Sequence, residues 1–156
     1  MDKSSACAMM NFYPVQKMRG SIVATNRQGL REIRERMQEL YVYDLYGFRT
    51  EIKPLASVLY PLETINCFAM GIHEGKRKLI VVTYYRIIIV STSFGSPAQI
   101  TEIPREAVSE PSYKKRFFTS SISFIADGTM HTFSLVSRRV LELFVWAVQL
   151  PAPIRS

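Results

Sequence analysis

The chain has 156 residues, 47% of them hydrophobic, and carries a formal net charge of +7. This length suits one domain with room for a short appendage, and no apolar run approaches the roughly 18 residues of a membrane-spanning helix. The charge is spread over both halves, with nine Lys and Arg against six Asp and Glu in residues 1–60, and eleven against seven in residues 61–156. Such a surface is compatible with anionic partners but identifies none. The simpler explanation of the net charge is that it keeps the protein soluble.

The N-terminal segment and the two cysteines favour a cytoplasmic protein. The apolar stretch at residues 8–10 is too short for the hydrophobic region of a secretory signal. Cys7 and Cys67 are far apart and make no disulfide framework, so both are expected as free thiols. Residues 1–25 lack a sustained period and are predicted to begin as a flexible arm.

An amphipathic helix is predicted after the arm, capped by Thr25 or Asn26. Its narrow apolar stripe consists of residues at helical spacing, Leu30, Ile33, Met37 and Leu40. The stripe needs one surface to lie against, either the chain's own sheet or another subunit. The opposite face interleaves Arg with Glu and is therefore expected to be solvated. A second helix fits residues 50–60, with Pro54 in its first turn.

Two apolar runs at residues 79–83 and 87–91 are rich in β-branched side chains. They predict an antiparallel hairpin, formed by strands at 76–83 and 86–93, in the centre of a sheet. Five further strands are predicted at residues 64–71, 99–103, 112–115, 120–126 and 129–135. A final helix is expected to follow a Ser137 cap and to end near Gln149, with Phe144 and Trp146 anchoring it to the sheet.

The order of these elements predicts an α+β fold that is mainly β. We expect a seven-stranded antiparallel β-sandwich or partly open barrel, capped by a C-terminal helix and preceded by N-terminal helices. Residues 1–45 are expected to form the arm and the amphipathic helix, and residues 46–156 the domain itself.

Two segments carry a family resemblance. The strand pair VTYYRIIIV at 82–90 is similar to a family pattern lTdkRlifv, with Tyr84-Tyr85 replacing the usual Asp-Lys or Asn-Lys, and EIPREAV at 102–108 matches the segment that follows. With the hairpin and helix after them, residues 51–150 resemble the bacterial pleckstrin-homology-like (PH-like) domains of the YokE type. The resemblance implies a PH-like fold, which serves many binding roles and specifies no reaction.

Residues able to support catalysis or metal binding are sparse. His73 and His131 are the only histidines, and neither zinc-ligand spacing nor a phosphate-binding glycine loop is present. Cys67 could be paired with His73 as a nucleophile, but its place in the middle of a strand favours a small buried side chain. We therefore expect no enzymatic activity, no metal site and no cofactor.

Basic residues gather at 76–78, at 114–116 and at the start of the last helix. Cations in a first helical turn oppose the macrodipole at about 0.3–1 kcal/mol each when exposed, so the residues at 138–139 are unusual. Solvent screening accounts for them in one interpretation. In the other, an anion site forms from Lys76, Arg77, Lys78, Arg138 and Arg139. In eukaryotic PH domains phosphoinositides bind beside the first strand–strand loop, which would correspond to residues 73–78.

Two functional hypotheses follow. The first is a non-catalytic PH-like module that self-associates or binds an unknown protein, and we expect a homo-oligomer, with a dimer favoured, whose interface includes the stripe of the first helix. The second is a peripheral binder of anionic lipid or nucleic acid through the basic turns, weak at a membrane surface and without a specific nucleic-acid ligand. Binding to phosphate groups weakens steeply with salt, so the salt dependence of binding distinguishes the two hypotheses.

Overall fold

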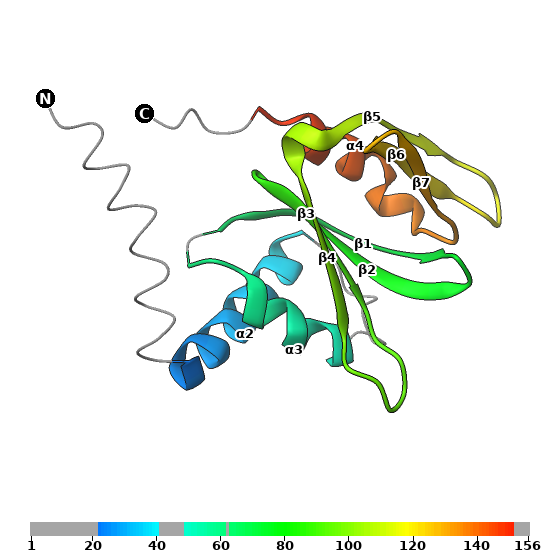
Figure 1. The fold of residues 1–156 in the computed structure, drawn as a ribbon. Coiled ribbons are helices and arrows are strands. Elements are labelled where there is room, and N and C mark those ends of the chain that lie inside the picture. The colour runs from blue at the N-terminus through cyan, green and yellow to red at the C-terminus, as the bar shows by residue number, and fades with distance from the viewer. Residues whose placement is uncertain (1–21, 41–48, 62, 152–156) are drawn as a thin grey trace, which may run out of the picture.

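The computed structural model describes residues 22–40, 49–61 and 63–151 (Figure 1). The predicted arm before residue 22, with Cys7, lies outside these residues. Within these ranges the helices are α2 (Ile22–Glu39), α3 (Arg49–Val58) and α4 (Leu141–Gln149), with short 3-10 turns η1 (Arg105–Ala107) and η2 (Arg138–Val140). The strands are β1 (Ile65–His73), β2 (Lys76–Thr83), β3 (Arg86–Ser91), β4 (Gln99–Pro104), β5 (Val108–Lys114), β6 (Ser121–Ala126) and β7 (Thr129–Phe133).

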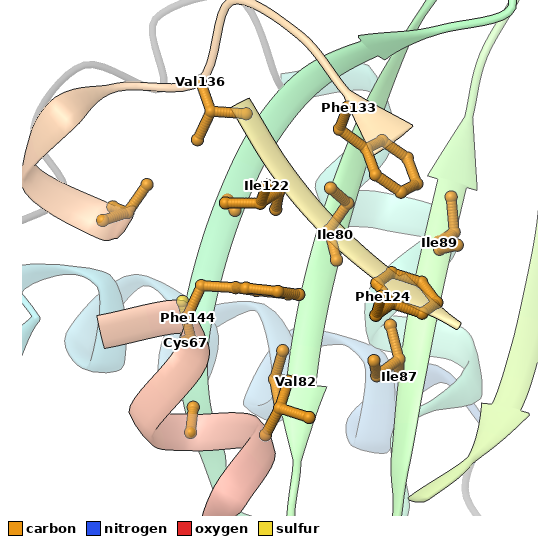
Figure 2. Packing of buried hydrophobic residues seen from close by; sticks show 14 of the residues in the cluster. Cys67, Ile80, Val82, Ile87, Ile89, Ile122, Phe124, Phe133, Val136 and Phe144 are labelled. Carbon is orange, nitrogen blue, oxygen red and sulfur yellow. The ribbon is translucent and has the colours of Figure 1, made fainter. Parts of the chain in front are cut away.

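The seven strands form two antiparallel sheets, which confirms the predicted mainly β class. One sheet has the order β1-β2-β3-β4 and the other has the order β5-β6-β7. Apolar side chains from both sheets and from α4 share one core, shown in Figure 2, where Phe144 of α4 reaches toward the strands. The C-terminal helix therefore closes the sandwich as expected. Phe144 is completely buried.

A second core lies on the other face of the first sheet, beneath α2 and α3 (Figure 1). Leu79 and Val81 of β2 point into this outer core, while Ile80 and Val82 point into the sandwich core. Alternate residues of a strand face opposite sides of the sheet. Burial on both sides thus explains why β2 and β3 read as continuous apolar runs instead of alternating ones.

Gly71 marks the place where β1 joins the two sheets. Ile72 of β1 forms an isolated bridge with Ser134, just after β7. A Cβ at position 71 would lie 2.8 Å from the Cβ of Phe133 and 3.0 Å from the carbonyl oxygen of Ser134. Only glycine permits so close a crossing without displacing a neighbour.

The N-terminal helices differ from the prediction at their starts. α2 begins at Ile22, so Thr25 and Asn26 lie inside the helix and do not cap it. Both residues are only mildly unfavourable in a helix interior, and a potential cap does not by itself stop a helix. Because α3 begins at Arg49, Pro54 stands in its second turn and not in its first.

The C-terminal helix also departs from the prediction at two points. Ser137 precedes the 3-10 turn η2 and makes no side-chain cap, and the α-helix starts only at Leu141. The predicted anchoring role of Trp146 is wrong, because 53% of this residue is exposed. Ala147 and Val148 are buried in its place, since the face of α4 that meets the sheets includes positions 144, 147 and 148.

Candidate functional site

A buried ionic network occupies the junction between the α3–β1 segment and the β2–β3 hairpin. Arg86 donates to both carboxylate oxygens of Glu63, from Nε at 2.9 Å and from Nη2 at 2.6 Å, and also to the carbonyl oxygen of Val58 at 2.7 Å. The guanidinium carbon lies 4.4 Å from the ring centroid of Tyr60. A further ion pair joins Arg86 to Glu102 of β4 at 2.9 Å. One arginine thus fixes three segments that are distant in sequence.

The surroundings of Arg86 act on its pKa in opposite directions. Burial lowers the pKa because it disfavours the charged guanidinium. The hydrogen bond and the charge of Glu63, together with Glu102, outweigh burial and raise the pKa overall. The guanidinium of Arg86 is therefore held in its charged form, and its contacts give it a structural role.

Arg105 has a similar role at the end of α4. Its guanidinium donates to the carbonyl oxygens of Val148 and Leu150 and, at 3.0 Å, to that of Thr83. Carbonyls at a helix C-terminus lack intrahelical partners and favour a nearby cation. Burial lowers the pKa of Arg105, but its hydrogen-bond partners explain why an arginine stands there.

The structure divides the predicted anion-binding residues between two regions. Arg77 lies 3.5 Å from the buried carboxylate of Glu51 in α3, whereas Lys78 acts electrostatically on His131 of β7. Lys76 is exposed. Since neighbouring residues of a strand alternate between its faces, the three cations of β2 do not converge on one point.

The arginines of η2 belong to a different neighbourhood. Arg138 donates to the carbonyl oxygen of Arg116, from Nε at 3.2 Å and from Nη2 at 3.0 Å, and its guanidinium carbon lies 5.5 Å from the ring centroid of Phe117. Arg139 is exposed. These contacts join η2 to the β5–β6 loop and not to residues 76–78, with which η2 was predicted to form one site.

The β5–β6 loop contains a feature that was not predicted from the sequence. Phe117 and Phe118 are 78% and 82% exposed, and they follow three cations, Lys114, Lys115 and Arg116, that are also exposed. The basic cluster could be recognised from the sequence. The two phenylalanines that follow it in a predicted turn were the additional signal of an exposed apolar surface. Large apolar side chains in a turn cannot all reach the core.

The residues considered for catalysis are held in structural positions. Cys67 is fully buried in the sandwich core, and burial raises the pKa of its thiol to about 12, so the predicted buried role is confirmed. His73 donates from Nδ1–H to the carbonyl oxygen of Thr132 at 2.9 Å, and its ring stacks on Phe133. In the described part of the chain, no three His, Cys, Asp or Glu side chains are grouped so that they could hold a metal ion.

The stripe predicted as an interface lies on the chain's own outer core. Ile33 is 1% exposed, and the remaining three residues, Leu30, Met37 and Leu40, are partly buried against the same cluster. Arg36 adds a hydrogen bond of 2.7 Å from Nε to the carbonyl oxygen of Ile65 in β1. Of the two surfaces considered for the stripe, α2 thus uses the sheet of its own chain.

The fold is that of a PH-like domain, with two antiparallel sheets closed by a C-terminal helix. A model of the family described as "Bacterial PH domain" matches residues 59–149. The chain belongs to this family, whose fold generally serves as a non-catalytic interaction module.

Comparison with solved structures finds similarity to the crystal structure of a pleckstrin homology domain from Shewanella amazonensis SB2B. The two chains are 18% identical, and the match covers 68% of this chain and 92% of the other, with a TM-score of 0.37. No curated protein matches the chain. Among the described helices, none combines the length and the apolar character that crossing a membrane requires.

Proposed function

We propose that this PH-like domain is a non-catalytic module that binds another polypeptide, a second copy of itself included. The observation that supports the proposal is the open edge of β4. This strand stands at the end of the four-stranded order and pairs with β3 on its inner side. Four of its six residues are exposed, namely Gln99, Thr101, Glu102 and Pro104.

An edge strand presents backbone N–H and C=O groups that another strand can pair with. Two copies that pair edge to edge would be related by a two-fold axis, which gives a closed dimer. The fully exposed side chain of Phe94, in the β3–β4 loop, adds apolar surface at one end of the strand. Pro104 lacks an N–H donor and would limit the pairing at the other end.

This proposal changes the surface through which we expect the homo-oligomer to form. The stripe of α2 already packs on its own chain, so the partly exposed residues Leu30, Met37 and Leu40 would contribute at most the margin of an interface. We also propose that the chain belongs to the YokE type within its family, on the support of the VTYYRIIIV strand pair, and that it acts in the cytoplasm.

Light scattering across micromolar concentrations, combined with amide hydrogen exchange, tests the proposal. An oligomer paired through β4 should protect amides of residues 99–103 as concentration rises. The amides of β2 are the internal control, because that strand is paired on both sides within the chain. A species that stays monomeric at all concentrations, with unchanged exchange in β4, would contradict self-association.

Binding to an anionic surface is a second candidate function. Its specific support is the β5–β6 loop, where exposed cations adjoin two exposed phenylalanines. Retention on anionic vesicles that falls as salt rises would support this candidate. Equal retention at low and high salt, or none at either, would contradict it.

A further inference from the structure

The loop between β5 and β6 presents an apolar tip to solvent. Phe117 and Phe118 meet edge to face, with their ring centroids 4.6 Å apart and their planes at 84°. Both rings are more than three-quarters exposed. The loop joins β5 to β6 at the right-hand edge of the view in Figure 1. Such a compact pair of exposed rings marks a surface that a partner is expected to cover.

The base of this loop is held by a set of hydrogen bonds. Ser120 is buried, and its hydroxyl donates to the carbonyl oxygen of Arg116 at 3.1 Å. The same carbonyl accepts two hydrogen bonds from Arg138. The amide of Val136 donates to the carbonyl oxygen of Ser120 at 3.0 Å. These contacts fix the start and the end of the loop, so the two rings project from an ordered base.

Positive charge adjoins the apolar tip in the chain and in the turn that supports it. Five exposed cations belong to the loop and to the turn that supports it, Lys114, Lys115, Arg116, Arg138 and Arg139. The segment from residue 111 to residue 121 contains no acidic residue. Cations next to exposed aromatic side chains are complementary to the boundary between anionic headgroups and acyl chains.

We propose that this loop, in the intact protein, docks on an anionic lipid surface, with Phe117 and Phe118 entering the interface and the five cations meeting the headgroups. The inference rests on the second candidate function and assigns it a site and a partner class. Single-stranded nucleic acid also combines with aromatic and cationic residues, but it needs open ring faces for base stacking. Here the two rings meet edge to face, and Arg138 lies over Phe117.

Vesicle sedimentation with the full chain tests the site directly. The probes are phosphatidylcholine vesicles with and without 30% phosphatidylglycerol, and glycerol phosphate serves as a soluble headgroup competitor. The double variant Phe117→Ser/Phe118→Ser should lower partitioning to the anionic vesicles at least tenfold. Met130→Ser is the matched control, because Met130 of β7 is 64% exposed and lies outside the β5–β6 loop, and it should bind like the unaltered protein.

The cations of the site are tested by a second variant and its control. Lys114→Gln/Lys115→Gln should lower partitioning by roughly fivefold for each charge removed. Lys76→Gln removes one exposed cation from the start of β2 and should have no comparable effect. For insertion depth, Phe118→Trp in a Trp146→Phe background should shift its fluorescence to the blue on anionic vesicles, and lipids brominated in the acyl chain should quench it.

The outcomes separate the site from the candidate function. If the protein binds anionic vesicles and the Phe117→Ser/Phe118→Ser variant binds equally well with an unchanged circular-dichroism spectrum, the loop is not the site, although surface binding stands. If the protein binds no vesicles, both ideas fail. Competition by glycerol phosphate at millimolar concentration, or tighter binding to a single-stranded oligonucleotide with no blue shift on vesicles, would also overturn the lipid assignment.

Discussion

Arg86 and Glu63 form an ion pair in which the side chains are only 8% and 2% exposed. Removing one member of such a pair leaves a charge without compensation in a poorly solvated site. We therefore expect Arg86→Met to lower the free energy of unfolding by about 3–5 kcal/mol, as measured by urea denaturation.

The pair offers two controls. Arg31→Met removes an ion pair to Glu35 whose side chains are 72% and 61% exposed, so it should change stability by less than about 1 kcal/mol. The double variant Arg86→Met/Glu63→Gln removes both buried charges and should be more stable than Arg86→Met alone. Equal midpoints for Arg86→Met and Arg31→Met would show that Arg86 does not hold the junction.

His131 predicts how stability depends on pH. Burial lowers its pKa, and the neighbouring charges of His73 and Lys78 lower it further, while Glu74 and Asp127 act in the opposite direction. In the unfolded chain the histidine pKa is about 6.5. Because the folded-state pKa is lower, the unfolded chain binds more protons than the folded protein just below that pH. Stability should fall as pH drops through about 6.5 and should level off below the folded pKa.

Thermal melts between pH 5 and 8 would measure this dependence. The variant His131→Gln cannot titrate at this position, so its melting temperature should fall less over the same range. A slope that is identical in the variant and in the unaltered protein would mean that other groups cause the dependence.

At the scale of elements, α4 is held by one aromatic residue and not by the other. Phe144 is fully buried between the sheets, whereas Trp146 is 53% exposed. Phe144→Ala should therefore cost about 3–5 kcal/mol of stability, and Trp146→Ala should stay within about 0.5 kcal/mol. Urea midpoints of the two variants compare them directly, and similar losses would contradict this assignment of faces.

The crossing of β1 over the end of β7 gives a second prediction at this scale. Gly71→Ala would bring its Cβ against Phe133 and Ser134 and should destabilise by about 1–3 kcal/mol. Gly29→Ala is the matched control, because a Cβ there would lie 3.6 Å from the nearest atom, at ordinary contact distance. Within α2 it should be neutral or should stabilise by about 0.5–1 kcal/mol. A stable Gly71→Ala protein would argue against the tight crossing.

The sequence predicted the helices and strands better than it predicted the side-chain contacts that join them. β2 and β3 were predictable because burial on both faces produces unbroken β-branched runs. The roles of Arg86 and Arg105 were not, since partners such as Glu63 and Leu150 lie 23 and 45 residues away in the chain. The proposed lipid-binding loop was visible as a basic turn, but the exposure of its phenylalanines depends on which side chains the core has room for.

At the scale of the whole molecule, the question is whether α2 belongs to the body of the domain. The domain boundary expected near residue 45 separates α2 from the sheets, yet α2 packs on α3 and β1 through the outer core. Without this helix, the apolar residues beneath it, such as Leu55 and Phe68, would lose part of their cover. A chain lacking residues 1–45 is therefore expected to expose apolar surface and to aggregate.

Ile33 distinguishes packing within the chain from packing between chains. Because Ile33 is 1% exposed in the single chain, Ile33→Ala should lower the free energy of unfolding by about 2–5 kcal/mol, by an amount that does not depend on protein concentration. Gln38→Ala, on the exposed side of the same helix, should have little effect. If α2 instead formed the interface of an oligomer, the loss caused by Ile33→Ala would vary with concentration and light scattering would report a smaller species. An unchanged urea midpoint for Ile33→Ala would remove α2 from the domain body.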